Sequence, residues 1–305
     1  MTDDRATEHR QLNVAQFTRM AAPFAEAPIH SEATSLRLLT AAVAAGPADR
    51  VLDVCCGTGI VACELAATAG HVTGVDLTPA MLDHARLLQK RRGVANVAWT
   101  TGEASALPFP DGTFDAAVSR YAFHHLTHPP TVLAEMARVC RPGGRVVVAD
   151  VYATGETQRA AYDRVERLRD PSHASAMLLV ELQSAFAACG LAAEPPAFYR
   201  LAVDLEEMLA GSRTPPKAAG EVRQLLSADV GVDATGMAPR RVGRALEFSF
   251  PVVVLAARKV WPTSGPADYR NSAKRRRYPS GSLTTNCRFV AHRSPHRYRR
   301  SSSGR

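Results

Sequence analysis

The chain has 305 residues, 46% of them hydrophobic, and a formal net charge of +8. This hydrophobic content is ample for a packed core, whereas no apolar run approaches the roughly 20 residues that cross a bilayer. The composition therefore excludes a membrane-spanning protein and predicts a soluble one built on one large domain.

The positive charge is concentrated in one segment. Residues 262–305 carry eleven Lys or Arg and one Asp, while the preceding 261 residues carry 26 basic and 28 acidic groups. A nearly neutral globule with one basic end does not describe a nucleic-acid enzyme, so we do not expect nucleic acid as a partner. Because residues 262–305 have little apolar periodicity, they are predicted to form a disordered basic tail. An arm that binds nucleic acid or an anionic surface is the alternative.

The six cysteines contain no C-x-x-C pair, so the spacing typical of zinc sites and disulfide frameworks is absent. No signal-peptide h-region follows Met1. These features predict a cytoplasmic protein whose cysteines mostly act as small buried apolar side chains.

Residues 1–45 begin polar and then become helical. Phe17 and Phe24 fall on a partly apolar face of the first predicted helix. Ser35–Ala45 is predicted to form a second helix, which Gly46-Pro47 can end. We therefore expect a helical segment ahead of the first strand.

The segment from Val51 to Asp76 has the spacing of a nucleotide-binding βαβ half. A strand, a glycine turn, a helix and a second strand are predicted at Val51–Val54, Gly57-Thr58-Gly59, Ile60–Ala69 and His71–Val75. Asp76 then lies at the carboxyl end of a parallel strand, where ligands bind and where a carboxylate can accept both hydroxyls of a ribose. We therefore predict a ribose contact for Asp76, with a helix N-cap as the alternative.

The same glycines leave a second class of enzyme open. The run from Gly57 to Ala62 formally fits the G-x-G-x-x-A form of the dinucleotide fingerprint, which would indicate an NAD(P)-dependent oxidoreductase. Asp53, which precedes Gly57 in the pattern D-V-C-C-G-T-G, argues against that class.

Further motifs follow in chain order. Gly102-Glu103-Ala104 comes after a predicted strand at Val97–Thr100, and L-P-F-P-D-G-T-F-D leads into a strand at Ala116–Ser119. A helix is predicted for Pro129–Cys140, and R-P-G-G separates it from another apolar run. This alternation of strands and helices is typical of a doubly wound parallel sheet.

With these motifs the chain resembles class I S-adenosylmethionine-dependent methyltransferases, of the type 11 and quinone C-methyltransferase-like kind that act on small molecules. D-V-C-C-G-T-G resembles their motif I, L-P-F-P-D-G-T-F-D their L-P-F-x-D-x-S-F-D signature, and R-V-C-R-P-G-G their hinge into the fifth strand. The resemblance, from Gln11 to Lys259, implies a Rossmann-like doubly wound α/β sheet of seven strands with an antiparallel last strand. It also implies that residues 1–45 form a helical lid, residues 46–261 the methyltransferase domain and residues 46–150 its cofactor half.

The resemblance further implies S-adenosylmethionine as the cofactor and methyl transfer to oxygen, nitrogen or carbon of a small organic molecule. The family's cofactor contacts correspond here to Asp53, Cys55, Gly57, Thr58, Gly59, Asp76, Leu77, Met81, Glu103, Ala104 and Arg120. Glu103 stands where the family more often has Asp. A non-catalytic binding module that keeps the cofactor fold is the alternative to an enzyme.

Beyond residue 150, helices are predicted for Glu156–Asp170 and Ala174–Cys189, and this insertion, residues 155–190, is expected to cover the substrate pocket. Strands are predicted for Phe198–Val203 and Glu247–Ala257, with helices between them. The run L-R-D-P-S-H resembles a narrower subgroup of uncharacterised small-molecule methyltransferases.

The end of the strand at 116–119 places two histidines at the edge of the expected cleft. Methyl transfer needs alignment of the reactants and removal of the acceptor's proton, so His124 and His125 are candidate bases. Packing is the alternative for each. Neither forms a metal-ligand set with His128, because no nearby carboxylate completes it, and no metal is expected. The predicted substrate contacts are Phe17, Tyr121, Phe123 and Tyr152.

Overall fold

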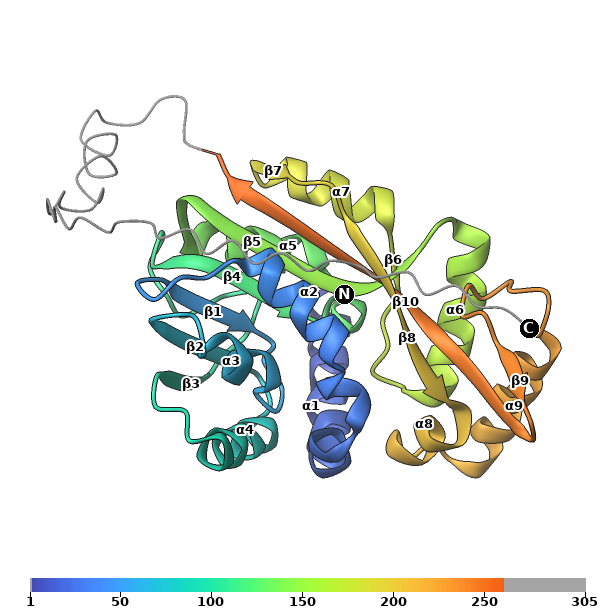
Figure 1. The fold of residues 1–305 in the computed structure, drawn as a ribbon. Helices are drawn as coiled ribbons and strands as arrows, with labels where there is room; N and C mark the ends of the chain where they lie inside the picture. Colours follow the sequence, from blue (N-terminus) through green and yellow to red (C-terminus); the bar gives the residue numbers. More distant parts are fainter. Residues whose placement is uncertain (1, 261–305) are drawn as a thin grey trace, which may run out of the picture. The chain divides into compact units, whose positions relative to one another are not determined.

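The computed structural model describes residues 2–260, and the predicted tail at 262–305 lies outside this part. Within residues 2–260, ten strands form one sheet whose main path runs β3-β2-β1-β4-β5-β10-β7 (Figure 1). The strands are β1 (Arg50–Val54), β2 (His71–Asp76), β3 (Val97–Thr101), β4 (Phe114–Arg120), β5 (Cys140–Ala153), β6 (Met177–Leu178), β7 (Leu191–Ala193), β8 (Ala197–Asp204), β9 (Arg240–Val242) and β10 (Ala245–Lys259).

Helices connect the strands and cover the sheet. They are α1 (Thr2–Glu26), η1 (Pro28–Ser31), α2 (Ala33–Val43), α3 (Ile60–Leu65), α4 (Pro79–Arg92), η2 (Phe123–His125), α5 (Pro129–Val139), α6 (Glu156–Arg169), α7 (Leu179–Ala188), α8 (Leu205–Gly211) and α9 (Pro216–Ala228). None of these helices has the length and apolar character that spanning a membrane requires.

The sheet confirms the predicted fold class. Strands β1 to β5 pair in parallel with their neighbours on the main path, and β10 pairs antiparallel to β5. The sixth strand predicted at Phe198–Val203 is β8, and the sheet has three short strands beyond the seven predicted, namely β6, β7 and β9. Pro195 and Pro196 lie between β7 and β8, where the missing backbone N–H groups interrupt the ladder.

Two predicted helices are shorter in the structure. The helix predicted for Ala174–Cys189 begins only at Leu179, because Met177 and Leu178 pair as β6 with the end of β5. The helix expected for Ile60–Ala69 ends at Leu65. In the first case the apolar residues outside the helix pair in the sheet, and in the second they form the turn that follows the helix.

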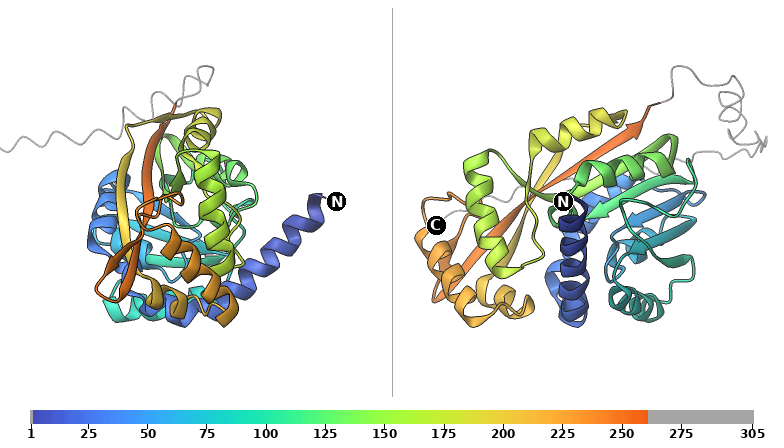
Figure 2. Two further views of the ribbon diagram at one scale, coloured as in Figure 1. Left: turned by 90° about the vertical axis from the view of Figure 1, so that its right-hand side faces the viewer. Right: turned by 180° about the vertical axis from the view of Figure 1, so that it is seen from behind.

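The core has one layer on each face of the parallel strands because alternate strand residues point to opposite faces. Leu52 of β1 packs in one cluster with buried residues of α5 and α7, while its neighbour Val51 packs in another with α2 and α3. A third cluster joins α6, α8 and α9 to the first half of β10, including Phe248. The left view of Figure 2, turned by 90° from Figure 1, shows helices on both sides of the sheet.

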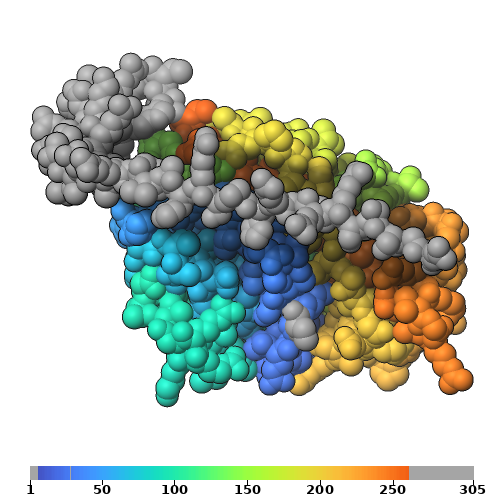
Figure 3. Space-filling view, in the orientation of Figure 1, coloured from blue at the N-terminus to red at the C-terminus, as the bar shows by residue number. Residues whose placement is uncertain are grey.

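Helix α1 lies between α4 and α8, and so between the parallel half of the sheet and the C-terminal half (Figures 1 and 2). The space-filling view shows the α1 and α2 residues at the surface between these two halves (Figure 3). The N-terminal segment is therefore part of the wall between the two halves of residues 2–260.

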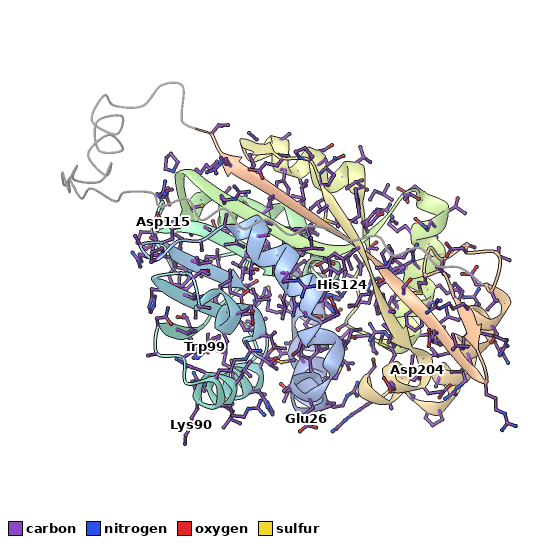
Figure 4. All side chains as sticks on the ribbon, in the orientation of Figure 1. Glu26, Lys90, Trp99, Asp115, His124 and Asp204 are labelled. Atoms are coloured by element: carbon purple, nitrogen blue, oxygen red, sulfur yellow. The ribbon has the colours of Figure 1, made fainter. Side chains whose placement is uncertain are left out.

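The glycines after β1 have different roles. Gly57 has φ of +52°, and a Cβ there would make an ordinary van der Waals contact with Phe24 at 3.9 Å. A Cβ on Gly59, which has φ of +78°, would lie 2.4 Å from Trp99 and 2.9 Å from the Cβ of Ala85. Trp99 comes from β3 and is labelled in Figure 4. Gly59 thus allows the first βαβ unit to pack closely against β3 and α4.

We predict that Gly59→Ala lowers the free energy of unfolding by at least about 2 kcal/mol, through overpacking and backbone strain. Gly220→Ala is the control, because Gly220 lies inside α9 with open space around its Cβ position. This control should raise the free energy of unfolding by roughly 0.5–1 kcal/mol. Urea denaturation of both variants measures the two effects, and an unchanged Gly59→Ala variant would contradict the packing role.

Candidate functional site

A cavity of about 300 Å³ lies at the carboxyl ends of β1, β2, β3 and β4 and is bounded on another side by α1. This is the edge at which ligands bind in open parallel sheets. The structure brings most of the predicted site residues together here. The predicted residues that line the cavity are Phe17, Asp53, Cys55, Gly57, Thr58, Asp76, Leu77, Met81, Glu103, Ala104, Arg120, Tyr121 and His125.

Four predicted site residues do not line this cavity. Gly59 lies against Trp99 as described above, and Phe123 is buried in the core cluster that contains α5. Tyr152 packs on Phe198, with ring centroids 5.4 Å apart. The ring of His124 is bonded to Asp150 in the interior of the protein. Packing therefore takes these side chains away from the cavity, and residues 155–190, expected to cover it, contribute none of its lining.

The prediction missed the polar residues of α1. His9, Arg10 and Asn13 line the cavity together with the expected Phe17. Asn13 follows Arg10 by three residues and His9 by four, and this spacing is the signal that could have found them, because it places them on the face of the helix that carries Phe17. An apolar pattern alone does not reveal this mixed stripe.

Asp76 joins the loops that follow β1 and β2. Its carboxylate accepts hydrogen bonds from the N–H of Gly57 and the N–H of Thr78, each at 2.8 Å. Burial raises the pKa of Asp76, and these two backbone N–H groups oppose the rise. The carboxylate lines the cavity and keeps further lone pairs for a ligand's hydroxyl groups.

Asp53 lies beneath the glycine loop and is fully buried. Burial raises its pKa to about 7, although the nearby Arg120 and the backbone of Ala62 act against the rise. Its Oδ2 atom and the hydroxyl of Thr58 have no hydrogen-bond partner within residues 2–260. Unpaired buried polar atoms are rare, so the loop after β1 has hydrogen-bonding capacity to spare.

Both arginines that line the cavity are engaged by the protein. Arg10 of α1 forms an ion pair of 3.1 Å with Glu103, which ties α1 to the loop after β3. Arg120 donates to the carbonyl of His30 at 2.6 Å and more weakly to Ser35, and its guanidinium lies 4.8 Å from the ring centre of Tyr121. These contacts fix the N-terminal helices over the cavity.

Two residues of the cavity have left-handed backbone conformations. Cys55 and Tyr121, which follow β1 and β4, both have φ of 56°. Such conformations in residues other than glycine cost on the order of 1–3 kcal/mol and often occur at functional sites. The hydroxyl of Tyr121 is also within 2.6 Å of the hydroxyl of Tyr199, which fixes its ring.

The two candidate histidines have different environments. Nδ1 of His124 lies 2.6 Å from Asp150, and although burial favours the neutral ring, this carboxylate raises the pKa of His124. Nδ1 of His125 lies 3.0 Å from the carbonyl of Ser172 and 3.1 Å from its hydroxyl. Burial, together with neighbouring His124, keeps the pKa of His125 well below its usual value. His125 is thus a neutral ring at the cavity.

Helix α1 contacts η2, the short turn that carries His124 and His125. His9 Nε2 and Asn13 Nδ2 both donate to the carbonyl of His125, at 2.9 and 3.0 Å. The ring of Phe17 meets the ring of His125 edge-on, with centroids 4.9 Å apart. The wall of the cavity and the candidate base are therefore one connected structure.

Comparisons with known proteins agree with this architecture. The family described as "Methyltransferase domain" matches residues 52–148. The uncharacterized methyltransferase YcgJ of Bacillus subtilis is 31% identical over 204 residues, which are 67% of this chain and 81% of that protein. Its crystal structure superposes with a TM-score of 0.71 at 27% identity, over 75% of this chain and 99% of that one.

Two other similar proteins have more specific names. The 2-phytyl-1,4-naphtoquinone methyltransferase of Synechococcus elongatus is 41% identical over 116 residues, which are 36% of this chain and 48% of that protein. A geranyl diphosphate methyltransferase solved in complex with S-adenosylmethionine shares the fold, with a TM-score of 0.54 and 19% identity over 75% of this chain and 86% of that one.

The strand order and the cavity at the strand ends define a Rossmann-like α/β protein of the class I methyltransferase type. With the match to YcgJ, the chain belongs to the methyltransferase family. The oxidoreductase and the non-catalytic module are not favoured, since the relatives reported above are all named methyltransferases.

Because the pKa of Asp53 is raised in the folded protein, the stability of the fold should depend on pH. Between its unfolded value of 3.8 and its folded value of about 7, the folded protein binds more protons than the unfolded chain, so this group's contribution to stability falls as pH rises. Asp53→Asn removes the effect. We predict that the stability of this variant relative to wild type increases from about pH 4 to about pH 8, by up to about 4 kcal/mol.

Denaturant titrations across this pH range measure the difference. Asp83→Asn is the control, because Asp83 lies on α4 with a side chain that is 72% exposed. Parallel stability curves for Asp53→Asn and wild type would contradict the burial of an easily protonated carboxyl group.

Proposed function

We propose that this methyltransferase transfers a methyl group from S-adenosylmethionine to a small organic acceptor. The observation that carries the proposal is the placement of Asp76, at the carboxyl end of β2, where it binds the N–H of Gly57 and lines the same cavity. A carboxylate in this position can accept the two hydroxyls of a ribose.

The residues present fit this cofactor. The unpaired Thr58 hydroxyl and Asp53 Oδ2 can meet the polar atoms of the methionine part, and the space above Gly57 admits a close approach. Glu103 and Ala104, which also line the cavity, would meet the adenine. When bound, S-adenosylmethionine supplies a methyl carbon that its sulfonium already activates. The complex of the geranyl diphosphate methyltransferase with this cofactor supports the assignment at the level of the fold.

The acceptor that we propose is uncharged where it meets the protein. Phe17, Tyr121 and Leu126 give this part of the lining an aromatic and apolar character. Both lining arginines already bind protein groups, so neither is free to balance an anionic acceptor. A small molecule with an ionisable hydroxyl, amine or activated carbon fits this lining best.

We assign the role of base to His125 rather than His124. The carbonyl of Ser172 can only accept, so the neutral ring of His125 carries its proton on Nδ1 and has a free lone pair on Nε2. His125 lines the cavity, whereas His124 is bonded to Asp150 and does not. Nε2 of His125 can take the proton that the acceptor loses as the new bond to carbon forms.

Asp76→Ala should weaken binding of S-adenosylhomocysteine by roughly 1.5–3 kcal/mol, the scale of hydrogen bonds to a charged group. Isothermal titration calorimetry of the full chain measures this change. Asp83→Ala on the neighbouring helix should bind like wild type, because its side chain points into solvent. Equal affinity of a folded Asp76→Ala variant and wild type would exclude the ribose contact.

His125→Gln should leave S-adenosylhomocysteine affinity within about twofold and lower turnover by roughly 10²–10⁴-fold, the usual effect of losing a general base. Turnover is measured as transfer of a tritiated methyl group into a metabolite extract, with the same extract for each variant. A His125→Gln variant with wild-type incorporation would show that this ring only packs.

A further inference from the structure

We propose that Asp170 and Ser172 are positioning residues for His125: together they fix which ring nitrogen carries the proton and hold the other one toward the cavity. This inference rests on the methyl transfer proposed above and gives a role to Asp170 and to the Ser172 hydroxyl, which the assignment of the base did not use.

A chain of hydrogen bonds, called the relay below, runs from Asp170 through Ser172 to His125. Asp170 Oδ1 accepts from the hydroxyl of Ser172 at 2.5 Å and from the N–H of Ser172 at 2.9 Å. The same hydroxyl and the carbonyl of Ser172 lie 3.1 and 3.0 Å from Nδ1 of His125. Asp170, Ser172 and His125 are all buried, so water does not compete for these bonds.

The direction of each bond follows from the chemistry of the groups. An ionised carboxylate only accepts, so the single proton of the Ser172 hydroxyl points to Asp170. The hydroxyl oxygen can then only accept from His125, as the carbonyl beside it does. Both acceptors require a proton on Nδ1, which leaves Nε2 as the acceptor at the cavity.

Asp170 has the charge that this relay needs. Although burial opposes ionisation, the neighbouring Arg169 holds the pKa of Asp170 below its usual value. Arg169 is paired with Glu166, and it also donates to the Ser212 hydroxyl at 2.7 Å. The buried Arg169, which is paired with Glu166, therefore keeps Asp170 ionised, the form that only accepts hydrogen bonds.

The segment of residues 170–173 is also tied to the turn that carries His125. The N–H of Ala174, the residue after the segment, donates to the carbonyl of His124 at 2.8 Å. The ring of His173 is within 2.8 Å of Asp163, and the N–H of Ala176 donates to the same carboxylate. These contacts hold the relay in register with the turn and with α6.

The relay also stabilises the state that His125 reaches after it takes a proton. The acceptor's proton is transferred to Nε2, the electron pair it leaves forms the bond to the methyl carbon, and the ring becomes a cation. Ser172 then accepts from the charged ring, and the carboxylate of Asp170 lies one hydroxyl group away. A carboxylate that acts on a histidine through one hydroxyl group is chemically sufficient to orient that histidine as a base.

The test is the tautomer of His125 in the full-length protein without any ligand. Long-range ¹H–¹⁵N NMR spectra of protein labelled with ¹⁵N-histidine distinguish the two tautomers, and His125→Gln assigns the signals. In wild type, His125 should carry its proton on Nδ1. In Asp170→Asn, the neutral amide oxygen holds the proton of the Ser172 hydroxyl more weakly than the carboxylate does. The hydroxyl can then turn and donate to Nδ1, so the tautomer with Nε2 protonated should rise at least tenfold.

Asp229→Asn is the matched control. Asp229 is a buried carboxylate that accepts from the hydroxyl and N–H of Thr235 in a loop away from the cavity. This substitution should leave the His125 signals as in wild type. A wild-type ring protonated on Nε2, or an Asp170→Asn spectrum like that of wild type, would overturn the assignment.

Ser172→Ala decides the question if Asp170→Asn does not fold. It removes the hydroxyl but leaves the carbonyl, so the same change of tautomer should occur to a smaller extent, and its absence would overturn the proposal. The measurement needs neither cofactor nor acceptor. If wild type failed to bind S-adenosylhomocysteine, the proposed methyl transfer would fail while the tautomer result stood on its own.

Discussion

The cavity depends on buried carboxylates that accept hydrogen bonds from backbone N–H groups at the ends of parallel strands. Asp76 holds the loop after β1 to the end of β2. Asp150 of β5 accepts from the N–H groups of Ala122 and Phe123 and so holds the turn after β4. A carboxylate can serve several donors at once, and burial strengthens each bond. The positions of the glycine loop and of the candidate base therefore follow from acidic residues on neighbouring strands.

This arrangement links the entrance of the cavity to its chemistry. Helix α1 is bonded to the carbonyl of His125 by two side chains, and Arg10 joins the same helix to Glu103. Any movement of α1 that admits a ligand must break these contacts, so binding at the proposed adenine end and order at the base are coupled through one helix. The α1 residues that line the cavity consequently also hold the turn that carries the candidate base.

The sequence could predict the features that depend on residues close together in the chain. The βαβ unit from β1 to β2 is local, so the strand end at Asp76 and its nearness to Gly57 follow from adjacent strands. It could not separate His124 from His125, because successive residues of a tight turn point to different neighbours. Those neighbours come from distant parts of the chain, Asp150 from β5 and Ser172 from the segment after α6. The short strand β7 was likewise missed, because its three residues pair with the distant end of β10.

The central claim is that a ribose binds to Asp76 at the strand ends. A crystal structure of the full chain soaked with S-adenosylhomocysteine tests it most directly. The account predicts the two ribose hydroxyls within hydrogen-bond distance of the Asp76 carboxylate, with the amino-acid part beside Gly57. A cavity without the nucleoside at saturating concentration, or a nucleoside whose ribose lies away from this carboxylate, would contradict it.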